Sequence, residues 1–367
     1  MSAGERLPLY VLTGFLGSGK TSLLRTLLRH PDFVDTAVIV NEFGQAGLDH
    51  HLLESADEET VVLQGGCVCC TVREDLAVTI GRLIERRAAG TLPAFRRLII
   101  ETSGLADPVP IVHTLKSDPR VTTALTFHGT LVTVDAQHAG PTLARHPEAQ
   151  RQLALADRVV ITKVDLATPA EIAATDALVA RLNPGVAAIH SGAAGLAPAA
   201  LLADVEHDPG ATLPQALRWL REPLRHGAAP DAGGLQSFSW LRFEALDWTV
   251  FGIWLTMLLH AHGTRILRVK GLLHVAGAAG PVAVHGVQHV VHPPLHLARW
   301  REDARLSRLV FIVDGLPEAR IRRSLDAFMH LADPGRTRPV RSKAVGAGAM
   351  IGGRPIKRPG APAWLKG

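Results

Sequence analysis

Apolar runs and amphipathic stretches alternate over about the first 200 residues of the chain. The apolar runs end in Gly, Asp or Asn, and they are LYVLTG, TAVIVNEFG, TVVLQGG, RRLIIETSG, LVTVDA and RVVITKVD. Helical stretches such as SLLRTLLRH and LAVTIGRLIERRAAG stand between them. Strands buried on both faces, with helices connecting them, pair in parallel. The pattern therefore predicts an α/β domain with a mainly parallel sheet, whose functional groups cluster at the carboxyl ends of its strands.

A different pattern follows a segment rich in Pro, Gly and Ala. Strand-like runs (FSWLRFEALDW, RILRVKGLLHVAG, PVAVHGVQHV, SRLVFIVDG) accompany two helical stretches, TVFGIWLTMLLHAHG and PEARIRRSLDAFMHLA. This mixture predicts a second, smaller α+β domain. We expect a first domain over 1–204, a linker over 205–236 with a helix at LPQALRWLRE, a second domain over 237–333 and a flexible basic tail over 334–367.

Composition and charge restrict the class of protein. Of 367 residues, 47% are hydrophobic and 20% charged, which is enough to bury a core. The first residues, MSAGERLPLY, lack the features of a secretory signal, and the longest apolar stretch is too short to span a bilayer. We expect a cytoplasmic protein without a membrane partner. The net charge of +5 is scattered, so we also expect no nucleic-acid partner.

The segment GFLGSGKT, which starts at Gly14, joins the first predicted strand to a helix. It matches a phosphate-binding loop, in which glycines let backbone N–H groups surround phosphate oxygens. Lys20 then reaches the β and γ phosphates and Thr21 ligates Mg²⁺. A Gly-rich turn can precede any helix, but strand, spacing, lysine and threonine together favour a nucleotide site. The predicted nucleotide-binding residues here are Gly14, Gly17, Ser18, Gly19, Lys20, Thr21 and Ser22.

The run RRLIIETSGLADP places an acidic residue, Glu101, at the end of a predicted strand. A carboxylate there holds a Mg²⁺ water or orients the attacking water, with Ser103 and Gly104 near the γ phosphate. Alone, Glu101 would be an ordinary acidic residue at a strand end. After a phosphate loop, we predict that Lys20, Glu101 and Gly104 are catalytic. Asp135, which ends LVTVDA, is a weaker candidate of the same kind.

The run RVVITKVD ends in Thr162, Lys163 and Asp165, and resembles the base-recognition signature of GTPases. A carboxylate accepts hydrogen bonds from N1–H and the exocyclic amine of guanine, whereas adenine offers no matching pair of donors. The motif therefore favours GTP over ATP, although a plain strand-to-loop Asp is the alternative. Backbone N–H groups after the next strand complete the predicted guanine pocket, at Ser191, Gly192 and Ala193.

All three cysteines of the chain lie in the segment GGCVCC. Three neighbouring thiols do not make an ordinary disulfide framework, and a redox dithiol has two residues between its cysteines. Thiolates favour zinc or cuprous copper, and one more N or O ligand completes a tetrahedron. The sulfurs converge only if the loop turns sharply, which the two glycines allow. We predict a transition-metal site, with buried filler cysteines as the alternative, at Cys67, Cys69 and Cys70.

Histidines gather in the second predicted domain, at positions His260, His262, His274, His285, His289, His292 and His296. On an extended strand, His285 and His289 share one face while His292 falls on the other. We therefore favour ordinary histidines over a second metal-acquiring site.

The order of five motifs is similar to that of the CobW family of P-loop GTPases, which is related to the urease and hydrogenase nickel-insertion GTPases. These motifs are GFLGSGKT, NEFG, GGCVCC, ETSGLADP and TKVD. The resemblance continues through RILRVKGLLHVAG, GVQHVVH and SRLVFIVDGL, which resemble the family's C-terminal domain. It thus covers nearly the whole chain except the basic tail.

The resemblance implies a Mg²⁺-dependent GTPase that acts as a metallochaperone and delivers a metal to a client protein. Zinc is the favoured metal. The alternative is Co²⁺, for cobalamin synthesis or for nitrile hydratase. The resemblance also implies that the cysteine motif binds the metal, that Glu42 is a candidate ligand or Mg²⁺ contact, and that a homodimer forms with nucleotide. Gln45 stands where many members have Glu, which weakens any auxiliary metal site there.

Coupling of GTP to metal requires that the metal prefers one nucleotide state. Two rival hypotheses remain from the sequence. One is a metal sensor or storage protein in which GTP only sets affinity and no client receives metal. The other is a P-loop kinase with a small acceptor, which the TKVD motif and the cysteines disfavour.

Overall fold

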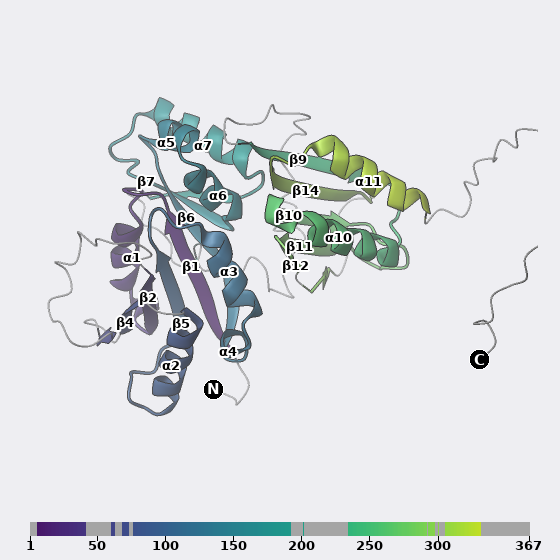
Figure 1. Cartoon of the computed structure of the whole chain (residues 1–367). Coiled ribbons are helices and arrows are strands. Elements are labelled where there is room, and N and C mark those ends of the chain that lie inside the picture. Colours follow the sequence, from purple (N-terminus) through teal and green to yellow (C-terminus); the bar gives the residue numbers. More distant parts are fainter. Residues whose placement is uncertain are drawn as a thin grey trace, which may run out of the picture. The chain divides into compact units, whose positions relative to one another are not determined.

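The computed structural model describes residues 6–41, 60–62, 68–72, 76–191, 201, 234–291, 293–297, 300 and 305–331. All of them lie within one compact unit, residues 1–332 (Figure 1). Several sequence predictions lie outside the described residues. These concern the helix at LPQALRWLRE, the basic tail, Glu42, Gln45, Cys67, Gly192, Ala193 and His292.

The first sheet has the strand order β3-β4-β2-β5-β1-β6-β7-β8. Its strands are β1 (Leu7–Gly14), β2 (Thr36–Asn41), β3 (Thr60–Val62), β4 (Val68–Val72), β5 (Arg97–Thr102), β6 (Leu125–Asp135), β7 (Arg158–Thr162) and β8 (Ala187–His190). Every neighbouring pair is parallel except β3 with β4. The predicted mainly parallel sheet is confirmed, and Thr60–Val62, at the start of the TVVLQGG run, forms its antiparallel edge.

Helices cover both faces of this sheet, as its continuous apolar strands require. They are α1 (Lys20–Leu28), α2 (Leu76–Ala88), α3 (Pro108–Ser117), α4 (Pro119–Thr122), α5 (Ala139–Arg145), α6 (Pro147–Leu155) and α7 (Pro169–Leu182), with a 3₁₀ turn η1 (Pro31–Phe33). Alternate residues of β1 point to opposite faces: Leu9 and Val11 pack with α2, α3 and α4, whereas Tyr10 and Leu12 pack with α1. The first domain is therefore a three-layer α/β structure.

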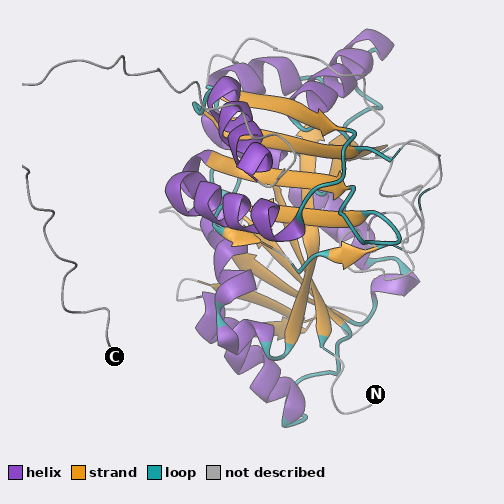
Figure 2. Ribbon diagram, turned by 90° about the vertical axis from the view of Figure 1, so that its right-hand side faces the viewer, coloured by secondary structure: helices purple, strands orange, loops and turns teal. Residues whose placement is uncertain are grey.

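The second sheet is antiparallel, with the order β12-β11-β10-β14-β9 and β13 paired to β11. Its elements are β9 (Leu235–Arg242), α10 (Trp248–His262), the 3₁₀ turn η3 (Gly263–Arg265), β10 (Ile266–Leu273), β11 (Val282–Val287), β12 (Val290–Val291), β13 (Leu295–His296), β14 (Ser307–Asp314) and α11 (Glu318–Leu331). Figure 2 shows the two sheets as separate sets of strands. The predicted α+β second domain is confirmed.

The two faces of the second sheet have different neighbours. One face packs on α10 and α11 through aromatic residues that include Phe251, Trp254 and Phe311. The other face adds Leu267 and Ile312 to a cluster with residues of α5, α6 and α7. This face of the second sheet therefore packs against helices of the first domain.

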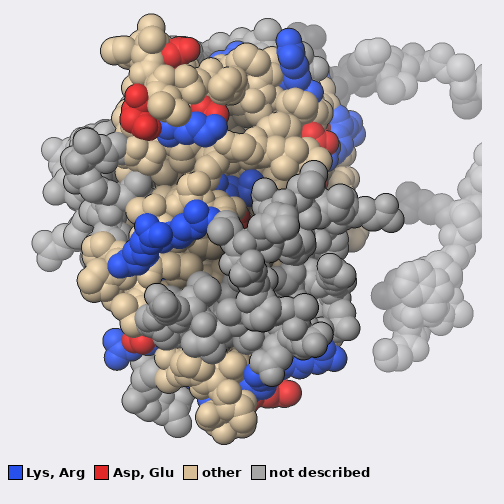
Figure 3. Space-filling view, turned by 90° about the vertical axis from the view of Figure 1, so that its left-hand side faces the viewer, with Lys and Arg blue, Asp and Glu red and all other residues tan. Residues whose placement is uncertain are grey.

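Charged side chains of both signs lie on the face of the molecule drawn in Figure 3, where a row of basic side chains crosses the middle. Among the helices of the described part of the chain, none is long and apolar enough to cross a membrane.

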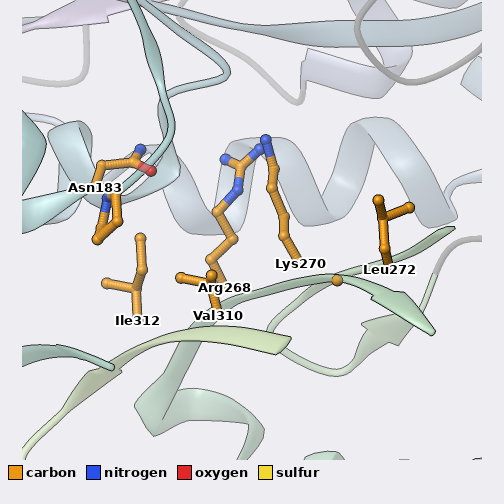
Figure 4. A pocket seen from close by; sticks show the side chains of 8 residues that line it. Asn183, Arg268, Lys270, Leu272, Val310 and Ile312 are labelled. Carbon is orange, nitrogen blue, oxygen red and sulfur yellow. The ribbon is translucent and has the colours of Figure 1, made fainter. Parts of the chain in front are cut away.

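A buried carboxylate, Asp157, joins the two sheets. Its side chain is 5% exposed and forms an ion pair with Arg268 of β10, which is 3% exposed. Lys270 Nζ, two residues along the same strand, donates to Asp157 Oδ1 at 3.4 Å. Figure 4 shows Arg268 and Lys270 pointing the same way from β10, as alternate residues of a strand do. On the first sheet, the Thr130 amide donates to Asp157 Oδ2 at 2.9 Å.

The cations around Asp157 determine its protonation. Burial by itself raises the pKa of Asp157, but the charges of Arg268, Lys270 and Lys116 and the Thr130 hydrogen bond outweigh it, so the pKa lies well below its usual range. A carboxyl with a depressed pKa stabilises the fold at neutral pH. This contribution is lost as the pH falls below the pKa of an ordinary Asp, which is about 4.

We predict that Asp157→Asn lowers the free energy of unfolding by about 3–5 kcal/mol at pH 7, because the buried Arg268 guanidinium loses this counter-charge. Its stability should also fall less steeply than that of the unchanged chain below about pH 4, because the ionised carboxylate is absent. Urea unfolding at several pH values measures both effects. Asp176→Asn, in an exposed pair with His190, is the control and should change stability by less than about 1 kcal/mol. Equal effects of the two substitutions would contradict the prediction.

Candidate functional site

The phosphate loop between β1 and α1 depends on glycine at two positions. Gly14 has a φ of +146°, and a Cβ there would lie 2.3 Å from Thr133 Oγ1. Gly19, with a φ of +87°, is the N-cap residue that precedes α1. Both conformations favour glycine, and the first also excludes any side chain for lack of space. The turn thus brings the amino end of α1, with its free N–H groups, to the carboxyl edge of the sheet.

Lys20 folds back into this turn. Its Nζ donates to Gly14 O at 2.9 Å and to Phe15 O at 3.2 Å, and the residue is 9% exposed. Burial lowers the pKa of Lys20, while the nearby Glu101 charge opposes that shift. An ammonium group buried among carbonyl oxygens gains from an anion that replaces them as partners.

Thr21 and Glu101 meet at the carboxyl edge of the sheet. Thr21 Oγ1 donates to Glu101 Oε1 at 2.7 Å, and Glu101 is buried near the end of β5, next to β1. A hydroxyl and a carboxylate are the hard oxygen ligands that Mg²⁺ takes beside a phosphate. The two residues that the sequence predicts for this role are therefore in contact, and their donor types fit the ion.

The loop that follows β5 lies directly on the phosphate loop. We call residues 103–107 the Gly104 loop. A Cβ on Gly104 would lie 2.7 Å from the Leu16 amide nitrogen and 2.8 Å from its Cα. Thr102 Oγ1 also donates to Thr13 Oγ1 at 2.7 Å. Only glycine allows this approach, so the predicted γ-phosphate residue, Gly104, is in contact with the predicted phosphate loop.

The Thr-Lys-Val-Asp turn after β7 is tied to the same loop. Thr162 Oγ1 donates to Ser18 O at 2.7 Å. Lys163 has a positive φ of 56°, and Asp165, in the turn that follows, is exposed. The Ser191 amide donates to Ile161 O at 2.8 Å, which holds the start of the next loop against β7. Thr162, the first residue of the predicted base-recognition motif, therefore lies beside the phosphate loop, and the base-recognition role of the motif stays a prediction.

Asp135 has a partner that the sequence analysis missed. Lys163 Nζ donates to Asp135 Oδ2 at 2.6 Å, the Gln137 amide donates to Oδ1 at 2.9 Å, and His138 Nδ1 lies 3.1 Å from Oδ2. Burial by itself raises the pKa of Asp135, but these hydrogen bonds outweigh it and hold the pKa below its usual value. Asp135 thus orients Lys163, and the role hypothesised for it by analogy with Glu101 stays a prediction.

A cavity of about 340 Å³ opens beside the phosphate loop. Its wall comes from the phosphate loop, the end of β6, α5 and α6, and includes Phe15, Ser18, Asp135, Gln152 and Lys163. Phe15 stacks on His146 there, with ring centroids 4.3 Å apart.

The cysteine motif falls mainly on a strand. Cys69 and Cys70 lie in β4, paired with Val38 and Ile39 of β2 on one side and with β3 on the other. The expectation of a sharply turning loop is therefore wrong for these two positions. The β-branched neighbours Val68, Thr71 and Val72 favour a strand over a loop. The metal-binding role of the motif stays a prediction.

The histidines of the second domain are dispersed. His285 is buried in β11, but His289 lies beyond a reversal at Gln288, whose φ is +50°. The expectation that His285 and His289 share a strand face is wrong, because the chain turns between them. His289 Nδ1 lies 2.9 Å from Leu259 O. Within the described residues, no group of three or more His, Cys, Asp or Glu is placed to hold a metal ion.

Sequence reasoning also missed Gln152 of α6. Gln152 Nε2 donates to Gly104 O at 3.1 Å and to Ala106 O at 3.0 Å. Its partners are backbone carbonyls 48 and 46 residues away, so no local motif marks it.

A glycine-lined strand-to-helix turn, a buried lysine within it and a Thr–Glu pair at the next strand define a P-loop nucleotide-binding protein. Comparison with known proteins identifies the family. Residues 8–190 match the model of the CobW/HypB/UreG nucleotide-binding domain, and residues 235–329 match that of the cobalamin synthesis protein CobW C-terminal domain. The chain belongs to the CobW/HypB/UreG family, and the predicted resemblance is confirmed.

Two curated relatives match nearly their whole length. The zinc chaperone YjiA of Escherichia coli is 31% identical over 318 residues, 85% of this chain and 95% of the relative. The zinc chaperone CobW of Pseudomonas aeruginosa is 30% identical over 361 residues, 89% of this chain and 92% of the relative. The crystal structure of Zn(II)-bound YjiA GTPase from E. coli superposes with a TM-score of 0.70 at 28% identity, covering 88% of this chain and 99% of that one.

We predict that Gly104→Ala slows nucleotide turnover. The added Cβ would overlap the Leu16 backbone, so the Gly104 loop must move away from the phosphate loop, and overpacking of this kind costs about 1–3 kcal/mol. We expect kcat for nucleoside triphosphate hydrolysis to fall at least about tenfold, since that cost falls on the Gly104 loop, which we predict to be catalytic. Steady-state phosphate release measures it.

The matched control is Gly81→Ala on α2, where a Cβ meets nothing within 4 Å. This substitution should raise stability by about 0.5–1 kcal/mol and leave kcat unchanged. The prediction is wrong if Gly104→Ala hydrolyses at the rate of this control.

Proposed function

We propose that the chain is a Mg²⁺-dependent GTPase that binds a transition metal through Cys67, Cys69 and Cys70 and passes it to a client protein. The observation that carries the proposal is the strand order β4-β2-β5-β1, because it places the cysteine strand in the same sheet as Glu101 and the phosphate loop. The names of the relatives, which include zinc chaperones and a GTPase, support it.

The hydrolytic part of the proposal uses groups already in contact. Lys20 is poised to exchange its carbonyl partners for phosphate oxygens. Thr21 and Glu101 would hold Mg²⁺, which neutralises charge on the β and γ phosphates when it is bound. The Gly104 amide, placed on the phosphate loop, stabilises charge that develops on the γ-phosphate oxygens.

Base selection is assigned to the turn after β7. Lys163, fixed by Asp135, would lie along the base, and the exposed Asp165 carboxylate would accept from the two donors of guanine. A kinase with a small acceptor is the rival for this half of the site. Phosphorylated acceptor in place of free phosphate would favour that rival.

The link between nucleotide and metal runs through β2. This strand pairs with the cysteine strand β4 on one side and with β5, which carries Glu101, on the other. Neighbouring strands are about 4.8 Å apart, so β4 and β5 lie about 10 Å apart. Movement of the loop that follows β5 on nucleotide exchange would therefore reach the cysteine strand through one intervening strand.

Zinc is the proposed metal, with Co²⁺ as the alternative. Thiolate ligands suit zinc, and the curated relatives are named zinc chaperones. A sensor or storage protein uses the same ligands but has no client. Transfer of metal to an isolated client protein distinguishes it from a chaperone.

Base specificity gives the first test. In Asp165→Asn, the side chain offers one donor and one acceptor, which mismatches the two guanine donors but matches the N1–H and C2 carbonyl of xanthine. We expect GTP affinity to fall by at least about 100-fold and XTP affinity to rise, as measured by nucleotide titration. Asp176→Asn, on exposed α7, is the control. Unchanged GTP affinity in Asp165→Asn would remove the base-recognition role.

Metal competition gives the second test. Reduced protein is titrated with Zn²⁺ against a chromophoric chelator at pH 7, in the GTP-analogue, GDP and empty states. We expect affinity to depend on nucleotide and to vanish in the triple variant Cys67, Cys69, Cys70→Ser. It should also weaken as pH falls, because protons compete for the thiolates.

The control for this titration is the double variant His260, His262→Asn, which should keep the affinity of the unchanged chain. Zinc binding that survives the triple Cys→Ser change would move the site away from the cysteines. Affinity that ignores nucleotide would contradict the coupling.

A further inference from the structure

Helix α6 holds the Gly104 loop through Gln152, which also lines the cavity beside the phosphate loop. Gln152 is 1% exposed, and its single amide group binds two carbonyls of the loop, those of Gly104 and Ala106. A buried amide that spans two peptides of one loop fixes the position of the whole turn, because both carbonyls would lose their partner if the turn moved.

Arg151, the preceding residue of α6, connects the same loop to the second domain. Its Nη1 donates to Asp107 Oδ2 at 3.3 Å, and its Nη2 donates to Asp314 Oδ2 at 3.1 Å. Asp107 ends the Gly104 loop and caps α3 by accepting from the Val109 amide at 3.0 Å. Asp314 is the last residue of β14. The Arg151 guanidinium group thus bridges the Gly104 loop and the second sheet.

The helix that carries these two residues is itself anchored. Asn183 Nδ2 donates to the carbonyls of Leu153 and Ala156 at 2.8 and 2.9 Å, and Arg268 Nη1 of β10 donates to Leu155 O at 2.5 Å. The carboxyl end of α6 is therefore fixed partly by a residue of the second sheet.

The close contact between the Gly104 loop and the phosphate loop bears on how the Gly104 loop would respond to a bound nucleotide. Gly104 is in contact with Leu16 of the phosphate loop, and a Cβ on Gly104 would lie 2.6 Å from Leu16 Cδ2. A terminal phosphate bound between these two residues would require the loop to shift, and the shift would change the two hydrogen bonds from Gln152. The two nucleotide states would then differ in their contacts with α6, which is what coupling requires.

We propose that Gln152 is a positioning residue for the Gly104 loop, and that Arg151 makes the loop's position depend on the second domain through Asp314. This inference rests on the proposed GTPase function. The two parts differ in strength. The Gln152 contacts are buried, whereas the side chains of Arg151, Asp107 and Asp314 are 41%, 35% and 29% exposed. Exposed ion pairs are weak and screened by salt, so the effect of the second domain is smaller.

The first experiment removes the Gln152 amide. In Gln152→Leu, we expect the ratio of GTP-analogue to GDP affinity to change by about tenfold and kcat to fall, because the loop loses the contacts that set its position. The control is Gln150→Leu in the same helix, where Gln150 is also buried but its amide donates to Leu143 O of α5. Both variants should lose similar thermal stability, but only Gln152→Leu should change the nucleotide preference.

A second variant, Gln152→Met, covers the case in which Gln152→Leu does not fold. A positioning role predicts the same change of nucleotide preference in Gln152→Met. If both Gln152 variants weaken GDP and GTP analogue equally, or behave like Gln150→Leu, Gln152 is merely structural and the inference is overturned.

The second experiment tests the link to the second domain. In Asp314→Asn, we expect the GTP-analogue to GDP preference to change about twofold to fivefold at low salt, and the change to disappear at 1 M salt. Glu318→Gln, which breaks an ion pair with Arg322 inside α11, is the control and should leave the preference unchanged. An Asp314→Asn variant equal to this control would overturn the second-domain part.

Failure of this inference is distinguishable from failure of the proposed function. If the unchanged chain binds and hydrolyses GTP but the Gln152 variants keep its nucleotide preference, only the inference fails. If the unchanged chain binds no guanine nucleotide, both fail.

Discussion

The fold depends on one buried charge. A carboxylate cannot remain ionised inside a protein without partners, so Asp157 requires cations from β10 and an amide from β6 at the same point. That requirement fixes the second sheet against the first domain. Arg268 pairs with Asp157 and also donates to the last carbonyl of α6. The position of α6, the helix beside the Gly104 loop, thus depends on a charge pair between the sheets.

The functional edge of the first sheet is governed by close approach of backbone segments. Gly14 leaves no space for a Cβ beside Thr133, and Gly104 leaves none beside Leu16. These contacts bring three strand ends together, so that the ammonium group of Lys20, the hydroxyl of Thr21 and the carboxylate of Glu101 share a small volume. The buried ammonium has a lowered pKa, and it has carbonyl partners that an anion can replace. Such a site favours a phosphate group over a neutral ligand.

The sequence predicts the contacts that parallel strands impose and misses those made across the fold. Glu101 and Thr21 could be placed together because both follow strand ends at one edge of a sheet, where carboxyl ends must meet. Asp135 could not be assigned to Lys163 from the sequence, since its position equally suits a Mg²⁺ contact. Gln152 and Arg151 carry no local signal, because their partners are a distant loop and a strand of the second domain. The cysteine motif was expected in a loop, although its β-branched neighbours favour the strand that Cys69 and Cys70 join.

The contacts proposed to couple the nucleotide site to the cysteine strand differ physically from those proposed to couple it to the second domain. Toward the cysteines, β5, β2 and β4 are joined by backbone hydrogen bonds between neighbouring strands, which do not depend on charged side chains. Toward the second domain, the connection passes through α6 and the exposed side chains of Arg151 and Asp314. A protein that changes its metal affinity with nucleotide needs the contacts toward the cysteines to be strong, because transfer is driven only by differential affinity. The connection to the second domain, as proposed, would be weaker, because ion pairs between partly exposed side chains are screened by salt.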